Sequence, residues 1–284
     1  ACLVGSEMCI RDRKNEEGVI MPIITKISTQ KRKGRYNIFI DNEYAFSVSE
    51  RTLAEKRLLK GTELSLEDIE KIKKAEADSH ALQLAMSYLS YQPRSVYEVL
   101  TYLNKQGISP EASQSAIENL IELNYLDDNN FARLFIQNNL RVGKDGPRSI
   151  SSKLKQKGVA NDIIQDSLYE VDDEEWIEAG MRLIHSIGHQ VGKMSYKEIK
   201  QKALKKLQTH GFNQELGELV VDQLDLESTE DDQLEALKKQ GIKAWRRYRR
   251  DDDFKRRQKV KRYLFQHGFS SGEIDSFLSG EVVN

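Results

Sequence analysis

Leu103-Asn-Lys-Gln-Gly107-Ile108 is the stretch that decides the fold, because three further versions of it follow along the chain. Each version reads Leu-x-x-x-Gly and continues with an apolar residue. The later copies are Leu154-Lys-Gln-Lys-Gly158-Val159, Leu207-Gln-Thr-His-Gly211-Phe212 and Leu264-Phe-Gln-His-Gly268-Phe269. The four glycines lie 51, 53 and 57 residues apart, so one structural unit is repeated along the chain.

Each copy predicts the end of one helix and the start of the next. The leucine occupies the last helical turn, and the glycine, which lacks a Cβ, suits a left-handed C-terminal cap. Ser109-Pro110 and Asn213 then supply N-cap chemistry for the following helix. Ten positions after the glycines come the apolar residues expected on the buried face of that helix: Ile117, Leu168, Val221 and Leu278. One more helix fits upstream in each unit, which predicts three-helix repeats.

The predicted fold is mainly α, with tandem three-helix repeats that form an elongated curved array behind a small β-rich module. A single repeat could not bury its apolar face well, so neighbouring repeats should stack. The predicted ranges are 21–76 for the β-rich module with its helices, and 77–126, 127–171, 172–228 and 229–284 for the four repeats.

The β-rich module is indicated by alternating apolar residues near the N-terminus. The alternation predicts three strands, at residues 23–28, 35–40 and 44–48. We expect a helix over residues 49–59, ended by Gly61, to cover the apolar face of the sheet. Ser65 and Asp68 then resemble a capping box at the start of a long polar helix.

The starts of several helices carry further signals. Acidic pairs precede helical runs at three repeat boundaries, namely Asp127-Asp128, Asp172-Asp173 and Asp231-Asp232. Carboxylates there favour the positive end of a helix, so we interpret them as structural rather than as metal ligands or acid–base groups. The second helix opens with Pro93-Arg-Ser-Val96 in the first repeat and with Pro147-Arg-Ser-Ile150 in the second. The longer distance from Pro93 to Gly107 predicts one extra helical turn in the first repeat.

Composition excludes a membrane-spanning protein. Charged residues make up 31% of the 284 residues, and no apolar run approaches the ~20 residues of a membrane span. Residues 1–20 hold both cysteines and resemble a translated sequencing adapter, so we predict a non-native tail and a natural start at Met21. The remaining chain has 41 residues of each charge sign and no cysteine, which fits a cytoplasmic location.

Basic residues are concentrated near the C-terminus. Between Lys243 and Arg262 there are eleven Lys or Arg and three Asp, interleaved with Trp245, Tyr248 and Phe254. Guanidinium groups pair with phosphate or carboxylate, and aromatic rings can stack on bases. The alternative is a solvated helix face with Trp245 and Tyr248 in the core, and the sequence leaves both interpretations open.

The sequence offers no motif of an enzyme or a metal centre. A phosphate loop, a dinucleotide fingerprint, a nucleophile elbow and a cysteine-based zinc site are all lacking, so we expect no catalytic residue, cofactor or metal. His185 and His189 have the i, i+4 spacing of metal ligands, but no Glu or Cys completes a set nearby. His210 and His267 precede repeat glycines, and we expect both to face solvent because Gln106 or Lys157 takes that place elsewhere.

Three segments together resemble a known family. They are Pro93-Arg-Ser-Val-Tyr-Glu-Val-Leu-Thr-Tyr-Leu-Asn-Lys-Gln-Gly107, Leu123-Asn-Tyr-Leu-Asp-Asp128 with Phe131-Ala132, and Gly146-Pro-Arg-Ser-Ile-Ser-Ser-Lys-Leu-Lys-Gln-Lys-Gly158. In this order they resemble the RecX family, which regulates the RecA recombinase, in the longer form of Gram-positive bacteria. The resemblance covers about residues 21–278. It implies a curved rod that binds in the groove of the RecA filament on single-stranded DNA and limits recombination, coprotease activity and the SOS response.

We therefore expect a non-enzymatic, monomeric regulator of the RecA filament. The alternative is a protein that binds single-stranded or double-stranded DNA directly. The residues proposed as contacts with RecA or nucleic acid are Arg94, Arg148, Lys153, Lys157, Trp245, Arg246, Arg247, Arg249, Arg250, Lys255, Arg256 and Arg257.

Overall fold

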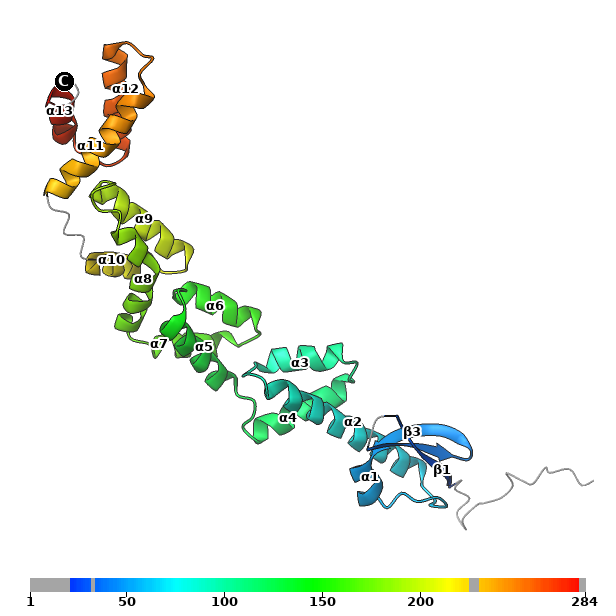
Figure 1. The fold of residues 1–284 in the computed structure, drawn as a ribbon. Helices are drawn as coiled ribbons and strands as arrows, with labels where there is room; N and C mark the ends of the chain where they lie inside the picture. The colour runs from blue at the N-terminus through cyan, green and yellow to red at the C-terminus, as the bar shows by residue number, and fades with distance from the viewer. Residues whose placement is uncertain (1–20, 32–33, 225–229, 281–284) are drawn as a thin grey trace, which may run out of the picture. The chain divides into compact units, whose positions relative to one another are not determined.

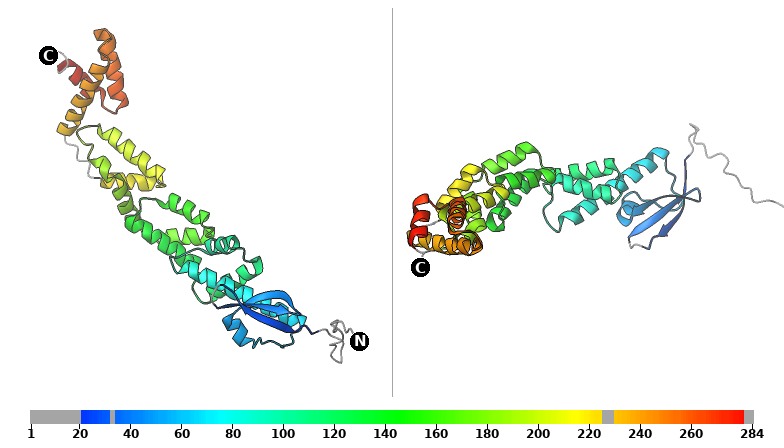
Figure 2. Two further views of the ribbon diagram at one scale, coloured as in Figure 1. Left: turned by 45° about the vertical axis from the view of Figure 1, so that its right-hand side comes forward. Right: turned by 90° about the horizontal axis from the view of Figure 1, so that it is seen from above.

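The computed structural model describes residues 21–31, 34–224 and 230–280 (Figure 1). Within these ranges the chain forms three strands and thirteen helices, so the predicted mainly α architecture with a small preceding sheet is confirmed (Figure 2). The chain divides into two compact units, residues 1–127 and residues 128–284. The tail predicted for residues 1–20 lies outside the described ranges.

The sheet of the first unit has the antiparallel order β1-β2-β3. Its strands are β1 (Ile24–Thr29), β2 (Arg35–Ile40) and β3 (Glu43–Ser49), within two residues of the predicted strands. Asp41 and Asn42 join β2 to β3 with φ angles of 48° and 71°. Two central residues with positive φ match the right-handed twist of a hairpin, which is why Asp and Asn occupy this turn.

The helix predicted to cover the apolar face of the sheet is shorter than expected. Helix α1 (Glu50–Glu55) ends four residues early, because Arg57 adopts a φ of 49° that breaks the helix before Leu58. No residue of α1 is fully buried. The apolar face of the sheet is instead covered mainly by Leu58, Leu64, Ile69 and Ile72, of which the last two belong to the next helix, α2 (Leu66–Leu89).

Helix α2 is continuous across the predicted boundary between residues 76 and 77. The predicted capping box of Ser65 and Asp68 starts it. At its middle, the buried carboxylate of Glu76 accepts hydrogen bonds from the Ser49 amide (3.0 Å) and the Thr52 hydroxyl (2.6 Å) and pairs with Arg35 (3.1 Å). The second half of α2 packs in the core of the first repeat. The domain boundary therefore stays a prediction.

The repeats have the predicted three-helix composition. The first repeat joins the second half of α2 to α3 (Val96–Lys105) and α4 (Pro110–Glu122). The second unit contains α5 (Asp128–Val142), α6 (Pro147–Gln156), α7 (Asn161–Tyr169), α8 (Asp173–Gly188), α9 (Tyr196–Thr209), α10 (Gln214–Gln223), α11 (Glu230–Arg247), α12 (Asp253–Gln266) and α13 (Ser271–Gly280).

The four repeat glycines end their helices as predicted. Their φ angles are 77°, 77°, 90° and 90° for Gly107, Gly158, Gly211 and Gly268. In the first copy the Gly107 amide donates to Asn104 (3.0 Å) and the Ile108 amide donates to Leu103 (3.2 Å), and the other copies repeat both bonds. This pair of bonds is a Schellman motif, which satisfies carbonyls that the helix leaves free. All four leucines are fully buried, so each turn is anchored in a core.

Two details of the helix starts correct the sequence interpretation. Helices α3 and α6 both have 10 residues, so the extra turn predicted for the first repeat is wrong. Ser95 is the N-cap of α3, whereas Pro147 is itself the first residue of α6. The additional residues between Pro93 and Gly107 therefore lie before α3 and do not lengthen it. Asp172 occupies the N-cap of α8, but its side chain makes no capping hydrogen bond.

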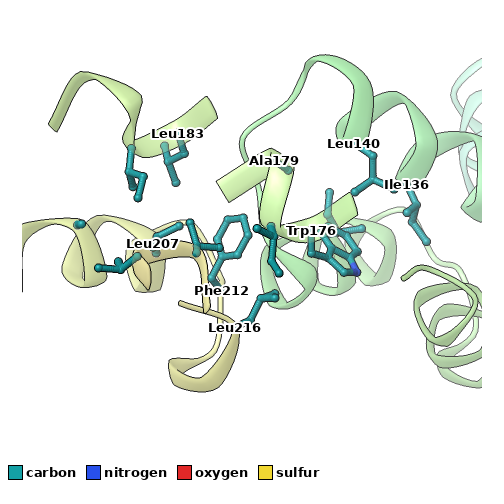
Figure 3. Close-up of a cluster of buried hydrophobic side chains, with 14 of the residues drawn as sticks. Ile136, Leu140, Trp176, Ala179, Leu183, Leu207, Phe212 and Leu216 are labelled. Atoms are coloured by element: carbon teal, nitrogen blue, oxygen red, sulfur yellow. The ribbon is translucent and has the colours of Figure 1, made fainter. Parts of the chain in front are cut away.

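The second and third repeats share one hydrophobic core. Trp176 of α8 is 3% exposed and belongs to the same cluster as Ile136 of α5 and Phe212, which follows α9 (Figure 3). The fourth repeat has a separate core built around residues such as Leu264 and Phe277. Repeats two and three should therefore unfold together, while the fourth repeat depends on its own packing.

Two of the repeat turns also join neighbouring repeats. The carbonyls of His210 and Gly211 accept hydrogen bonds from the amides of Gly146 (2.8 Å) and Arg148 (3.0 Å), at the start of α6. In the same way, the Ser195 hydroxyl at the start of α9 donates to the His267 carbonyl. Both histidines are half-buried at these junctions, and the side chain of His210 is 37% exposed, so each faces solvent only in part.

Substitution of the junction glycine tests this packing. A Cβ on Gly211 would lie 2.4 Å from the Ser149 amide nitrogen, whereas a Cβ on Gly107 would meet no atom within 4 Å. We expect Gly107→Ala to lower the local free energy of unfolding by ~1–2 kcal/mol of backbone strain, and Gly211→Ala to lower it by a further ~1–3 kcal/mol because of overlap. Hydrogen exchange of peptides from α4 and α10 measures both. Equal losses of unfolding free energy in the two variants would contradict the close contact between Gly211 and the start of α6.

Candidate functional site

Charge is distributed by helix position within the repeats of the second unit. The second helix of each repeat is basic: α6 carries three Lys or Arg and no acid, α9 five against one, and α12 six against one. The third helix is acidic, because α7, α10 and α13 contain Asp and Glu but no Lys or Arg. In the second unit, the second helix of a repeat therefore has an excess of positive charge and the third helix has only negative charge.

Basic residues recur at equivalent positions of α9 and α12. Lys202 and Lys259 lie five residues before the buried repeat leucine, and Lys205 and Arg262 lie two residues before it. All four side chains are exposed. We call these four residues the basic row.

The ion pairs of the basic row are few. Lys202 lies 3.8 Å from Glu198 and Lys259 lies 2.7 Å from Asp251. Lys205 and Arg262 have no acidic partner among the described residues. At least half of the row is therefore available to an external anion.

The predicted contacts in the first two repeats occupy different environments. Arg94 is half-buried, pairs with Glu98 at 3.6 Å and lies 4.5 Å from the centre of the Tyr88 ring, so it serves local packing. Lys153 is exposed and pairs with Asp145. Lys157 lies 5.7 Å from the centre of the Phe131 ring.

Arg148 keeps an exposed side chain at the start of α6. Its backbone amide is used by the junction with Gly211, but no ion pair of its guanidinium occurs within the described ranges. Of the four contacts proposed in these two repeats, Arg148 is therefore the one best placed for an external anion.

Two of the three aromatic residues of the basic C-terminal block pack against a core. Trp245 and Tyr248 are half-buried against the core of the fourth repeat. The Cζ atom of Arg256 lies 3.8 Å from the centre of the Trp245 ring, and its Nε and Nη2 atoms donate to the Trp245 carbonyl at 3.0 and 2.7 Å. Arg257 donates to the Leu278 carbonyl at 2.9 Å. For these residues, the packing interpretation fits better than the ligand-binding one.

The remaining arginines of the block face solvent. We define the arginine cluster as Arg246, Arg247, Arg249 and Arg250, at the end of α11 and just after it. Nearby, Phe254 is 71% exposed. Lys255 pairs with Asp252 at 3.1 Å, and the amide of Lys255 donates to the Asp252 carboxylate, which lowers the pKa of Asp252 below its ordinary value.

Within the described residues, the histidine pair and one hollow are the remaining places where a metal or small ligand could be considered. The rings of His185 and His189 lie 5.0 Å apart, but no group of three or more His, Cys, Asp or Glu is arranged for a metal within the described residues. A hollow of about 510 Å³ is lined by Trp176, Leu216 and the carboxylates of Asp172 and Asp173, among other residues. These carboxylates lie at the start of α8, where they favour the positive end of the helix.

Matches to family models cover four stretches of the chain. Residues 22–65 match the N-terminal domain of regulatory protein RecX, and residues 81–120, 127–168 and 230–278 match the first, second and third RecX three-helix domains. A relative from Lactobacillus gasseri, named regulatory protein RecX, is 80% identical over 264 residues, which are 93% of this chain and 97% of the relative. The chain belongs to the RecX family. A Bacillus subtilis relative of the same name is 36% identical over 92% of this chain and 99% of its own length.

Solved RecX structures resemble parts of the chain. One, a crystal structure of regulatory protein RecX, has a TM-score of 0.57 and 31% identity over 71% of this chain and 99% of its own. Another, RecX from Lactobacillus salivarius, has a TM-score of 0.51 and 28% identity over 54% and 99%. Helices α8–α10 lie between the second and third matched domains, so this RecX family member has a fourth three-helix unit there.

The contacts proposed from the sequence leave out the basic residues of α9 and those in the C-terminal half of α12, although the latter belong to the basic block between Lys243 and Arg262. The equivalence of Lys205 and Arg262 becomes visible only when the repeats are aligned on their leucines. That alignment was accessible from the sequence. No described helix of this RecX family member is long and apolar enough to cross a membrane.

Substitution of Arg256 separates the structural part of the block from the exposed part. We expect Arg256→Lys to lower the free energy of unfolding of the fourth repeat by ~1–2 kcal/mol, because lysine cannot both stack on Trp245 and donate twice to its carbonyl. Arg249→Lys should change it by less than ~0.5 kcal/mol. Urea unfolding followed by Trp245 fluorescence, in a Trp176→Phe background, measures both. Equal effects of the two substitutions would show that Arg256 stabilises the fourth repeat no more than the exposed Arg249 does.

Proposed function

We propose that this protein binds the RecA filament on DNA and reduces its recombinase and coprotease activities during DNA repair and the SOS response. Its relatives are named regulatory proteins, and its repeats supply several similar contact surfaces along one chain. A filament presents identical subunits at regular intervals. Several weak contacts on such a lattice multiply through effective concentration, so a repeat protein can bind tightly without one strong site.

The proposed mechanism is occupation of the filament rather than catalysis. Among the described residues, no three His, Cys, Asp or Glu are grouped for a metal, and the second helices of the second unit carry mainly basic residues. We propose a monomer that acts in the cytoplasm, where a body without cysteines at residues 21–284 is compatible with reducing conditions.

The arginine cluster is the candidate contact that the fourth repeat offers to the filament. Its four guanidinium groups are exposed, and the neighbouring Arg256 and Arg257 are used internally. Arginine forms bidentate hydrogen bonds with carboxylates and phosphates. The cluster can therefore pair with acidic side chains of a recombinase or with the phosphates of DNA.

The experiment is an assay of DNA-dependent ATP hydrolysis by RecA. We expect this protein to slow hydrolysis at less than one molecule per RecA protomer, because one bound chain contacts several protomers. Arg249→Glu combined with Arg250→Glu should raise the concentration needed at least about fivefold, given ~1 kcal/mol or more for loss of two charge-assisted contacts. Lys60→Glu combined with Lys74→Glu is the control with the same change in charge on exposed lysines of the first unit.

Unchanged ATP hydrolysis at equimolar protein would reject filament regulation. Equal weakening by the control pair would show that total charge, rather than the arginine cluster, determines the effect.

A further inference from the structure

We propose that the hollow between the second and third repeats is a docking site for a basic segment of a protein partner. The occupant places an aliphatic or aromatic side chain in the hollow and a lysine or arginine at its rim. This deepens the proposed function, on which it rests in taking the filament protein as the partner. The hollow is lined by no residue of the basic row or of the arginine cluster.

The hollow has an apolar floor. Its volume is about 510 Å³, within the ~300–1,000 Å³ of ligand sites. Trp176 of α8 and Leu216 of α10 line it with buried side chains that belong to the core shared by the two repeats (Figure 3). Two further lining residues reach solvent, because Leu219 is 43% exposed and Tyr169 is 90% exposed. Protein interfaces use such aromatic and aliphatic side chains as anchors.

The rim of the hollow is acidic. Asp172, Asp173 and Glu215 line it, and all three residues are exposed. No ion pair of these carboxylates occurs in the part of the chain that the structure describes. The exposed Arg148 follows the lining residue Pro147 but does not line the hollow itself. The rim therefore presents uncompensated negative charge to an occupant.

Helix capping explains the rim only in part. Asp172 occupies the N-cap of α8, but its side chain makes no capping hydrogen bond. At the start of α10, the side chain of Asn213 already accepts a hydrogen bond from the Leu216 amide at 2.8 Å, so Glu215 is not needed as a cap. The carboxylates do favour the positive ends of the two helices. That effect does not account for their position around an apolar hollow.

Charge complementarity selects the occupant. Lysine and arginine combine an apolar stem, which can lie along the wall of the hollow, with a cationic head that can pair with a carboxylate. Carboxylates repel phosphate groups, so the rim disfavours nucleic acid. The exposed Tyr169 and Leu219 favour a partner that brings apolar side chains of its own. A protein segment with both basic and apolar side chains satisfies the rim and the floor.

The hollow depends on the additional three-helix unit of this chain. Residues 127–168 and 230–278 match RecX three-helix domains, and most of the lining residues lie between these ranges. Of the lining residues, Pro147 and Leu168 alone belong to the second matched domain. The additional unit therefore supplies a contact that a RecX protein without it would lack.

The first test measures how this protein slows DNA-dependent ATP hydrolysis by RecA. The rim variant combines Asp172→Asn, Asp173→Asn and Glu215→Gln, which keep the shapes of the side chains. We expect it to raise the concentration needed for half-maximal slowing at least about fivefold, because pairing with a cation is lost. Loss of negative charge alone would instead tighten binding to a DNA filament, so the two explanations predict opposite signs. Leu219→Gln should also raise that concentration at least about fivefold, through loss of an apolar anchor.

The control variant makes the same change in charge on the first unit. It combines Glu67→Gln, Glu111→Gln and Glu122→Gln, at three exposed carboxylates. Glu67 and Glu111 lie in first helical turns, as Asp173 and Glu215 do, so the loss of helix stabilisation is matched. The control should change the concentration for half-maximal slowing less than about twofold.

The second test needs no recombinase. The probe is a fluorescein-labelled peptide of alternating leucine and arginine, and its binding to the full chain is followed by fluorescence anisotropy. The rim variant should bind the peptide at least about fivefold more weakly than the wild type, because the pairing carboxylates are lost. The control variant should bind it as the wild type does, and a peptide of alternating leucine and glutamate should not bind.

The outcomes separate this proposal from the proposed function. Unchanged slowing of RecA by both the rim variant and Leu219→Gln, or equal losses in the rim and control variants, would overturn the proposal and leave the proposed function standing. If the wild-type protein did not slow RecA, the proposed function would fail. Weaker peptide binding by the rim variant alone would then still support docking of a basic segment, and equal binding would overturn it. Self-association of the wild type in sedimentation that the rim variant abolishes would assign the hollow to a second copy of the chain and overturn the proposal.

Discussion

The left-handed glycine at the end of the second helix is the constraint on which the repeat architecture depends. At Gly211 it lets the chain close a Schellman motif and also brings two carbonyls against the start of α6, where a Cβ would collide with Ser149. One backbone conformation thus ends a helix and orients the next repeat. Because the buried leucine four residues earlier fixes the rotation of that helix, it also determines which side chains reach solvent.

The basic row is a consequence of this geometry. Lys205 and Arg262 are exposed because each lies two residues before a leucine that the turn holds in the core. The third and fourth repeats therefore share this positive charge, although the total charge of the chain is close to zero. A balanced composition can conceal a strongly basic surface when most of the acids lie on other helices, as in α7, α10 and α13.

Local signals predicted most of the fold. The repeat turns, the strands and the capping box at Ser65 depend on a few neighbouring residues, and the structure confirms them. The early end of α1 depends on how Leu58 packs beneath the sheet, which is a tertiary contact. Likewise, the burial of Trp245 under Arg256 could not be separated from an exposed aromatic face, because both arrangements have the same helical spacing.

Site-specific photocrosslinking within a RecA filament on DNA tests the central claim most directly. A photoreactive residue at Lys205 of α9 would be compared with one at Glu218, which is exposed on the acidic helix α10. If the basic helices face nucleic acid, Lys205 should crosslink to the oligonucleotide, and Glu218 should crosslink to protein alone. Crosslinks to DNA from Glu218 with none from Lys205 would contradict the account.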